Sequence, residues 1–169
     1  MPARKLVLDY VSRYPGIHVR EIERRLGLPS RLAAYHLEQL EHEGQVQCIQ
    51  EPGFARYFPA VGKPRWSRRE MEFLCLMRHA VALRITVLLL SETEMAQGDI
   101  ARRLDLAKAS TSYHLALLVK AGLVEVRRAG RQRIYCLSEP THVTGMLANF
   151  TPIPEDLDTF TGIWNDLFG

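Results

Sequence analysis

Four arginines lie within a seven-residue stretch of the 169-residue chain, at Arg127, Arg128, Arg131 and Arg133, and no acidic residue lies among them. Guanidinium groups at this density attract polyanions, because each can bind a phosphate oxygen and release a condensed counterion. A solvated charged turn is the ordinary alternative, but four arginines with no acidic residue among them favour DNA. This stretch therefore predicts contact with a nucleic-acid backbone.

A second group of candidate contacts precedes the arginines, within residues 108–121. Short side chains that donate and accept hydrogen bonds suit base edges, and a lysine suits a phosphate. Leu115 and Leu118 recur at helical spacing and are expected to face the core. We expect Ser110, Thr111, Ser112 and Tyr113 to face bases, and Lys108, His114 and the arginines to face phosphates.

The elements that must position these side chains can be read from changes in hydrophobic period. A helical period gives way to strand-like alternation after Gly122, which ends the second helix as a left-handed cap would. Helix, turn, helix and a two-stranded ribbon form a winged helix-turn-helix. The expected elements are helices over 98–104 and 108–121, a turn over 105–107, and strands over 123–127 and 132–137 around a turn over 128–131.

Residues 108–115, 121–124 and 130–135 resemble the recognition helix and wing of ArsR-type and MarR-type transcriptional regulators of archaea and bacteria. In that family the second helix enters the DNA major groove and the wing lies along the backbone. The family pattern also has a histidine at the position of His114. The resemblance implies a transcriptional regulator that binds duplex DNA sequence-specifically, and a two-fold dimer would imply a roughly palindromic site.

The same pattern occurs earlier in the chain. Shifting the sequence by 78 residues places residues 22–46 on residues 100–124 with 11 identities in 25 positions, which indicates a duplicated domain. One deletion in the wing would then align Gly53 and Arg56 with Gly130 and Arg133. In the first copy we expect helices over 2–14, 19–26 and 30–43, with Ser30 as a cap, and strands over 45–50 and 55–59.

The first copy differs from the second in charge. Glu38, Glu41 and Glu43 lie on its reading helix, Glu51 lies in its wing, and Arg56 is the single basic residue of that wing. We therefore expect the second copy to dominate DNA affinity. The first copy either reads neighbouring DNA or has become a protein-contact module. Its candidate DNA contacts are Ser30, Arg31, Tyr35, His36 and Arg56.

The sequence thus predicts a mainly helical α+β protein with small β wings and four segments. They are a first winged helix-turn-helix domain over 1–60, a linker over 61–66, a second such domain with a long leading helix over 67–138, and C-terminal amphipathic helices over 139–169.

The segments that flank the second domain are apolar enough to need a packing partner. Ser67 and Glu70 form a capping-box pattern that begins one long helix, or two helices meeting near His79. Pro140 begins another helix, and residues 155–168 make an aromatic amphipathic one. These faces bury either on their own chain or across a two-fold axis, and the family resemblance favours a homodimer.

Charge is uneven, although the net formal charge is only +3. Residues 1–60 contain 8 basic and 7 acidic residues, and residues 61–138 contain 14 basic and 7 acidic residues. Residues 139–169 contain 5 acidic residues and no basic one. Cys48, Cys75 and Cys136 are too scattered for a disulfide framework or a zinc knuckle, which suits a reducing cytoplasm. Polar residues break the most apolar stretch, 73–90, so no membrane span is expected.

Other function classes find less support in the sequence. The chain has no glycine-rich phosphate loop, nucleophile elbow or matched carboxylate pair, so we expect neither enzymatic activity nor a cofactor. Residues 105–107 hold no thiol pair, which makes a metal site of the ArsR type doubtful. The alternative is a protein scaffold resembling condensin-associated or ESCRT-type subunits, with a partner on the first domain or the C-terminal helix. The all-basic wing argues against that alternative.

Overall fold

The computed structural model describes residues 2–51, 54–61, 66–153, 161–162 and 165. The chain forms two compact units, one of residues 1–75 with 149–151 and the other of residues 76–148 with 152–169. The predicted linker and C-terminal helix fall largely outside the described residues, as do positions 52–53 of the first wing.

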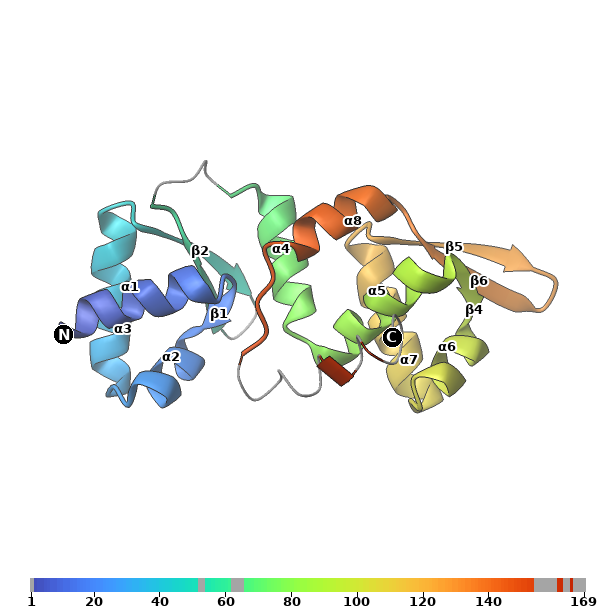
Figure 1. Ribbon diagram of the computed structural model, residues 1–169, viewed down its shortest axis with the longest axis horizontal. Coiled ribbons are helices and arrows are strands. Elements are labelled where there is room, and N and C mark those ends of the chain that lie inside the picture. The colour runs from blue at the N-terminus through green and yellow to red at the C-terminus, as the bar shows by residue number, and fades with distance from the viewer. Residues whose placement is uncertain (1, 52–53, 62–65, 154–160, 163–164, 166–169) are drawn as a thin grey trace. The chain divides into compact units, whose positions relative to one another are not determined.

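The first unit is a winged helix-turn-helix (Figure 1). Its three strands pair antiparallel in the order β1-β3-β2. Val7, Ile22, Leu37 and Phe58 are fully buried in its core, and burying each such side chain contributes about 1.5–3 kcal/mol. The elements are α1 (Ala3–Arg13), β1 (Ile17–His18), α2 (Val19–Leu26), α3 (Ser30–His42), β2 (Val46–Glu51), β3 (Phe54–Pro59) and α4 (Arg68–Met77).

The second unit has the same order of elements, with strand order β4-β6-β5. Helix α5 is buried around most of its circumference, which explains why its sequence is apolar throughout. The β5–β6 hairpin extends beyond the helices of its unit (Figure 1). The elements are α5 (Ala80–Glu92), β4 (Glu94–Ala96), α6 (Gln97–Arg103), α7 (Lys108–Lys120), β5 (Val124–Ala129), β6 (Gln132–Leu137) and α8 (Pro140–Leu147).

The bounds of α3, β2 and β3 differ from those of α7, β5 and β6 by the 78-residue offset of the sequence repeat. The backbone conformation repeats as well. Gly27 and Asp105, which are equivalent residues at the helix-turn-helix corner, both have a left-handed φ, of 62° and 52°. The predicted deletion in the wing is wrong, because both hairpins have two-residue loops and the offset continues through them. Arg56 therefore corresponds to Ile134, and not to Arg133.

Two short strands were not predicted. β1 and β4 contain two and three residues, too few to show a strand period in the sequence, and each adds a third strand beside its wing. Of the two arrangements predicted for the stretch that begins at Ser67, the structure has the second: two helices, α4 and α5, separated by residues 78–79. The predicted capping box is confirmed, since Ser67 N donates to Glu70 Oε2 at 2.8 Å and Glu70 N donates to Ser67 Oγ at 3.2 Å.

Ser30 does not cap α3 as expected. It is the first helical residue, and its hydroxyl donates to Glu23 Oε1 at 2.7 Å. Pro140 begins α8 as predicted, and Val143 and Met146 are buried beneath that helix. No single helix in the described part of the chain is long and apolar enough to cross a membrane; α4 and α5 meet the length and composition requirement only as a broken pair.

Candidate nucleic-acid interface

The corner between α6 and α7 fixes the direction of the reading helix. Leu106 N donates to Ala101 O at 2.9 Å, and Asp105 takes up the left-handed conformation that the tight turn requires. Leu115 and Leu118 then anchor α7 in the core. As a result, the opposite side of α7 presents Lys108, Ser112 and Tyr113 to solvent, with Tyr113 61% exposed.

Thr111 does not face outward, contrary to the prediction. Its side chain is fully buried, and its hydroxyl donates to Ala107 O at 3.0 Å. A Thr111 in this position cannot contact a base. The sequence misled because Thr111 is polar and lies between two serines, whereas its helical position four residues before Leu115 places it on the core face.

His114 is half-buried and oriented by its own helix. Its Nδ1 lies 2.9 Å from the Ser110 carbonyl oxygen. Because a carbonyl oxygen can only accept, Nδ1 carries the proton and Nε2 is left for another partner. The ring meets that of Tyr113 edge-on, with centroids 5.1 Å apart. Tyr35 and His36 make the corresponding contact in the first unit, at 5.5 Å.

The wing has two chemically different faces. Arg128 and Arg133 are cross-strand partners on the face that also carries Tyr135 and Leu137. Tyr135 and Leu137 are buried near the base of the hairpin, whereas both arginines are exposed toward its tip. One face of the hairpin is therefore apolar and buried at the base of the hairpin, and basic and exposed at the tip.

A hollow of about 620 Å³ lies between the wing and the two helices of the corner. Four predicted contacts, Lys108, Ser112, Arg131 and Arg133, line it together. Sequence reasoning missed the polar residues Gln97 and Gln132, which also line the hollow. Gln97 lies there because its Oε1 accepts from the hydroxyl of Tyr135 at 3.2 Å, a pairing for which the sequence holds no signal.

Arg127 lies on the other face of the hairpin. Its Nη2 donates to both carboxylate oxygens of Glu94, at 2.9 and 3.1 Å. This ion pair is half-exposed, and pairs of that kind contribute about 0–1 kcal/mol. Arg127 therefore differs from the other wing arginines, since it already has a partner in the protein.

The first unit places its candidate contacts differently. Ser30, Arg31 and Tyr35 are exposed on α3, and His36 is half-buried. Arg56, predicted to contact DNA, is buried: Nη1 donates to Gly16 O at 3.0 Å and Nε to Glu51 at 3.2 Å. Arg56 is thus a structural residue. The reading helix and wing carry two basic and four acidic residues in 30–59, against six and one in 108–137.

His18, which looked ordinary in the sequence, caps α2. Its Nδ1 accepts from Arg20 N at 3.0 Å, so the ring must be neutral to serve as the cap. Burial lowers the pKa of His18, and the positive charges of Arg56 and Arg20 lower it further. Neutral His18 is thereby favoured in the folded state.

No group of three or more histidine, cysteine, aspartate or glutamate side chains suited to a metal ion occurs among the described residues. Cys48, Cys75 and Cys136 are free thiols, with Cys75 buried and the others half-buried. The candidate site in the described structure is therefore the hollow lined by Lys108, Ser112, Arg131 and Arg133.

Comparison with known proteins identifies the family to which the two domains belong. The sequence pattern of a helix-turn-helix domain family matches residues 77–127, and that of an N-terminal helix-turn-helix domain matches residues 1–71. The transcriptional activator HlyU of Vibrio cholerae is 33% identical over 81 residues, which cover 48% of this chain and 73% of HlyU. The chain belongs to the winged helix-turn-helix transcriptional regulators.

Two further comparisons concern a longer relative and a solved structure. The uncharacterized HTH-type transcriptional regulator MJ1398 of Methanocaldococcus jannaschii is 25% identical over 136 residues, 80% of this chain and 33% of MJ1398. The chain therefore spans about a third of the length of that relative. The solved structure of reduced HlyU is 31% identical with a TM-score of 0.43, and the match covers 47% of this chain and 82% of HlyU.

Proposed function

We propose that this regulator binds duplex DNA through its second unit, with α7 in the major groove and the β5–β6 hairpin along the backbone. The observation that carries the proposal is the hollow in which Lys108 and Ser112 of α7 meet Arg131 and Arg133 of the wing. None of these three cations has an ion-pair partner among the described residues. A phosphate backbone supplies the missing negative charge.

The base contacts come from the exposed side of α7. Ser112 and Tyr113 are exposed, and Ser110 is half-buried beside them. Hydroxyl groups donate to or accept from base edges, and the Tyr113 ring provides apolar contact. Lys108 then contacts a phosphate, and His114 joins it only with both ring nitrogens protonated, because an unprotonated Nε2 cannot donate to a phosphate oxygen. Thr111 is left out of this set because it is buried.

The first unit contributes little to DNA affinity in this proposal. The single basic residue of its wing, Arg56, is held in an internal ion pair with Glu51. In addition, the reading-helix segment carries three glutamates. Ser30, Arg31, Tyr35 and His36 remain accessible for a weak contact with neighbouring DNA. Two chains acting as a homodimer would read two half-sites, which makes a roughly palindromic operator the expected target.

The test is a fluorescence-anisotropy titration of duplex DNA at several salt concentrations. The native chain is compared with the triple variant Arg128→Ala, Arg131→Ala, Arg133→Ala. Each lost phosphate contact should flatten the logarithmic salt dependence by about 0.9, so the triple variant should lose up to about 2.7. A matched control removes three exposed arginines of the first unit, Arg13, Arg20 and Arg24.

The expected result is a steep native slope that the wing variant loses and the control keeps. Equal slopes in all three proteins would disprove readout through the second wing. Complete absence of binding by the native chain would favour the scaffold alternative, in which the same fold binds polypeptide.

A further inference from the structure

Strand β2 is an outer strand of the first unit's sheet. The order β1-β3-β2 leaves one side of β2 without a strand neighbour in the described part of the chain. Every second residue of an outer strand points its N–H and C=O away from the sheet, which makes such an edge a template for another strand.

Edge strands are usually protected by charged residues, and β2 lacks this protection. From Val46 to Gln50 it carries no charged side chain, and the carboxylate of its last residue, Glu51, is held by Arg56. The equivalent strand β5 of the second unit carries Glu125, Arg127 and Arg128. The duplication therefore supplies an internal comparison: one copy has a charged edge, and the other has an edge open to pairing.

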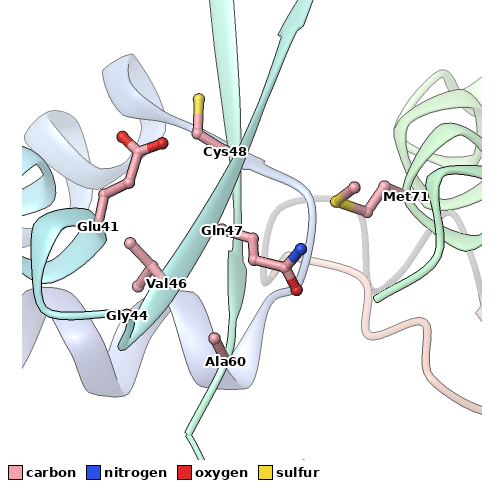
Figure 2. A pocket seen from close by; sticks show the side chains of 7 residues that line it. All are labelled: Glu41, Gly44, Val46, Gln47, Cys48, Ala60 and Met71. Atoms are coloured by element: carbon pink, nitrogen blue, oxygen red, sulfur yellow. The ribbon is translucent and has the colours of Figure 1, made fainter. Parts of the chain in front are cut away.

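A groove of about 480 Å³ runs beside this open edge. Figure 2 shows Val46, Gln47 and Cys48 at consecutive positions of β2, Glu41 from α3 on one side and Met71 on the other. The volume lies within the range of about 300–1,000 Å³ that is typical of ligand sites. Val46 and Met71, which are 2% and 9% exposed, are apolar lining residues of the groove, and the strand backbone provides hydrogen-bonding groups.

Glu41 is the charged residue of the groove, and it has no ion-pair partner among the described residues. Its neighbours stay neutral. Burial raises the pKa of Cys48, and the charge of Glu41 raises it further; burial, Cys48 and Glu41 together raise the pKa of Tyr57 to about 12. Among the described residues, the groove thus keeps one uncompensated negative charge. In the second unit the position of Glu41 is occupied by Val119.

We propose that the β2 groove binds an extended basic segment of a partner protein, which adds to the sheet as a fourth strand. A lysine or arginine of that segment would pair with Glu41, and an adjacent apolar side chain, which points to the other face, would pack against Met71. Backbone pairing supplies the affinity, and the charge and the apolar wall supply selectivity. This binding does not depend on DNA binding by the second unit.

Other occupants fit the groove less well. A second copy of the chain pairing edge to edge would offer residues 44–55, which contain no lysine or arginine for Glu41. Duplex DNA would bring phosphates toward the unpaired carboxylate, which repels them. A basic polypeptide is the occupant whose charge complements the groove.

The test uses the full chain and a fluorescein-labelled peptide in which lysines alternate with valine and threonine. A second peptide has glutamate in place of each lysine, and a third has proline at its centre, which removes a backbone N–H. The variant Glu41→Lys is compared with Glu38→Lys, which makes the same charge change on α3 at a residue that does not line the groove. Thermal unfolding of both variants verifies that they fold.

The basic peptide should bind, and the acidic and proline peptides should bind more weakly. Glu41→Lys should weaken binding at least about tenfold, because a repulsive charge replaces an attractive one, and Glu38→Lys should weaken it less than about twofold. Equal loss in the two variants, equal binding of the three peptides, or no binding up to about 1 mM peptide would overturn the proposal. So would a gain in duplex DNA affinity larger in Glu41→Lys than in Glu38→Lys.

Discussion

Arg128 and Arg133 occupy directly opposite positions on the two strands of the second wing. Like charges in such a pair destabilise a hairpin by roughly 0.2–1 kcal/mol. Neither side chain has an ion-pair partner among the described residues. The wing therefore carries a local repulsion in the free protein, and a phosphate placed between the two guanidinium groups would relieve it.

Replacing Arg128 with threonine should consequently have opposite effects on stability and on binding. The free energy of unfolding should rise by about 0.5 kcal/mol, because the repulsion is removed and threonine favours strands. The salt dependence of duplex binding should flatten by about 0.9. Chemical denaturation and anisotropy titration measure the two quantities. A less stable variant would show that the arginines support the wing in the free protein.

The ion pair between Arg127 and Glu94 makes a separate prediction. Glu94→Gln removes the carboxylate that holds Arg127 and one negative charge beside the wing. Duplex affinity should increase severalfold at low salt, while the free energy of unfolding should change by less than about 1 kcal/mol. Arg127→Ala in the Glu94→Gln background should abolish the gain. If the gain persists without Arg127, the effect is due to net charge alone.

The sequence was sufficient to predict the helices and wings, because the 3.6-residue and two-residue periods survive in both copies. The bounds of α2 and β6 were predicted correctly, and Gly122 has the expected left-handed φ of 76°. Short pairings were missed, since β1 and β4 are too brief to carry a period. Such strands are created by tertiary contact with β3 and β6.

Residue roles were harder to predict than elements. Arg56 was assigned to DNA by matching it with Arg133, but the hairpin registers place it opposite Ile49 and inside the sheet. Its buried guanidinium is held by Gly16 and Glu51, and neither partner is near it in a helical or strand pattern. A charge in the sequence therefore does not distinguish a phosphate contact from an internal ion pair.

The assignment of α7 side chains can be tested with a pair of adjacent substitutions. Thr111→Val keeps the buried shape but removes a hydroxyl bonded to Ala107 O. It should lower the free energy of unfolding by about 1 kcal/mol and leave duplex affinity unchanged. Ser112→Val should leave stability nearly unchanged and weaken binding to a cognate duplex. Anisotropy titration and thermal unfolding measure both effects. Loss of binding in Thr111→Val without loss of stability would contradict the buried position.

The cap formed by His18 should make stability depend on pH. Its folded pKa lies below the ordinary value of 6.5, so the unfolded chain takes up the proton first as pH falls. The stabilisation is therefore fully present above pH 6.5 and is lost as pH falls through the lowered folded value. Protonation also removes the acceptor at Nδ1, and a helix cap is worth about 1 kcal/mol.

His18→Asn provides the matched comparison, because asparagine is a good cap that does not titrate. The free energy of unfolding should be measured by urea denaturation between about pH 5 and 8, the interval around the ordinary histidine pKa. The native chain should lose more stability than His18→Asn as pH falls, and the two should agree most closely at the alkaline end. The other five histidines are present in both proteins, so the difference isolates His18. Parallel pH curves would show that Arg20 N does not depend on the imidazole for its hydrogen bond.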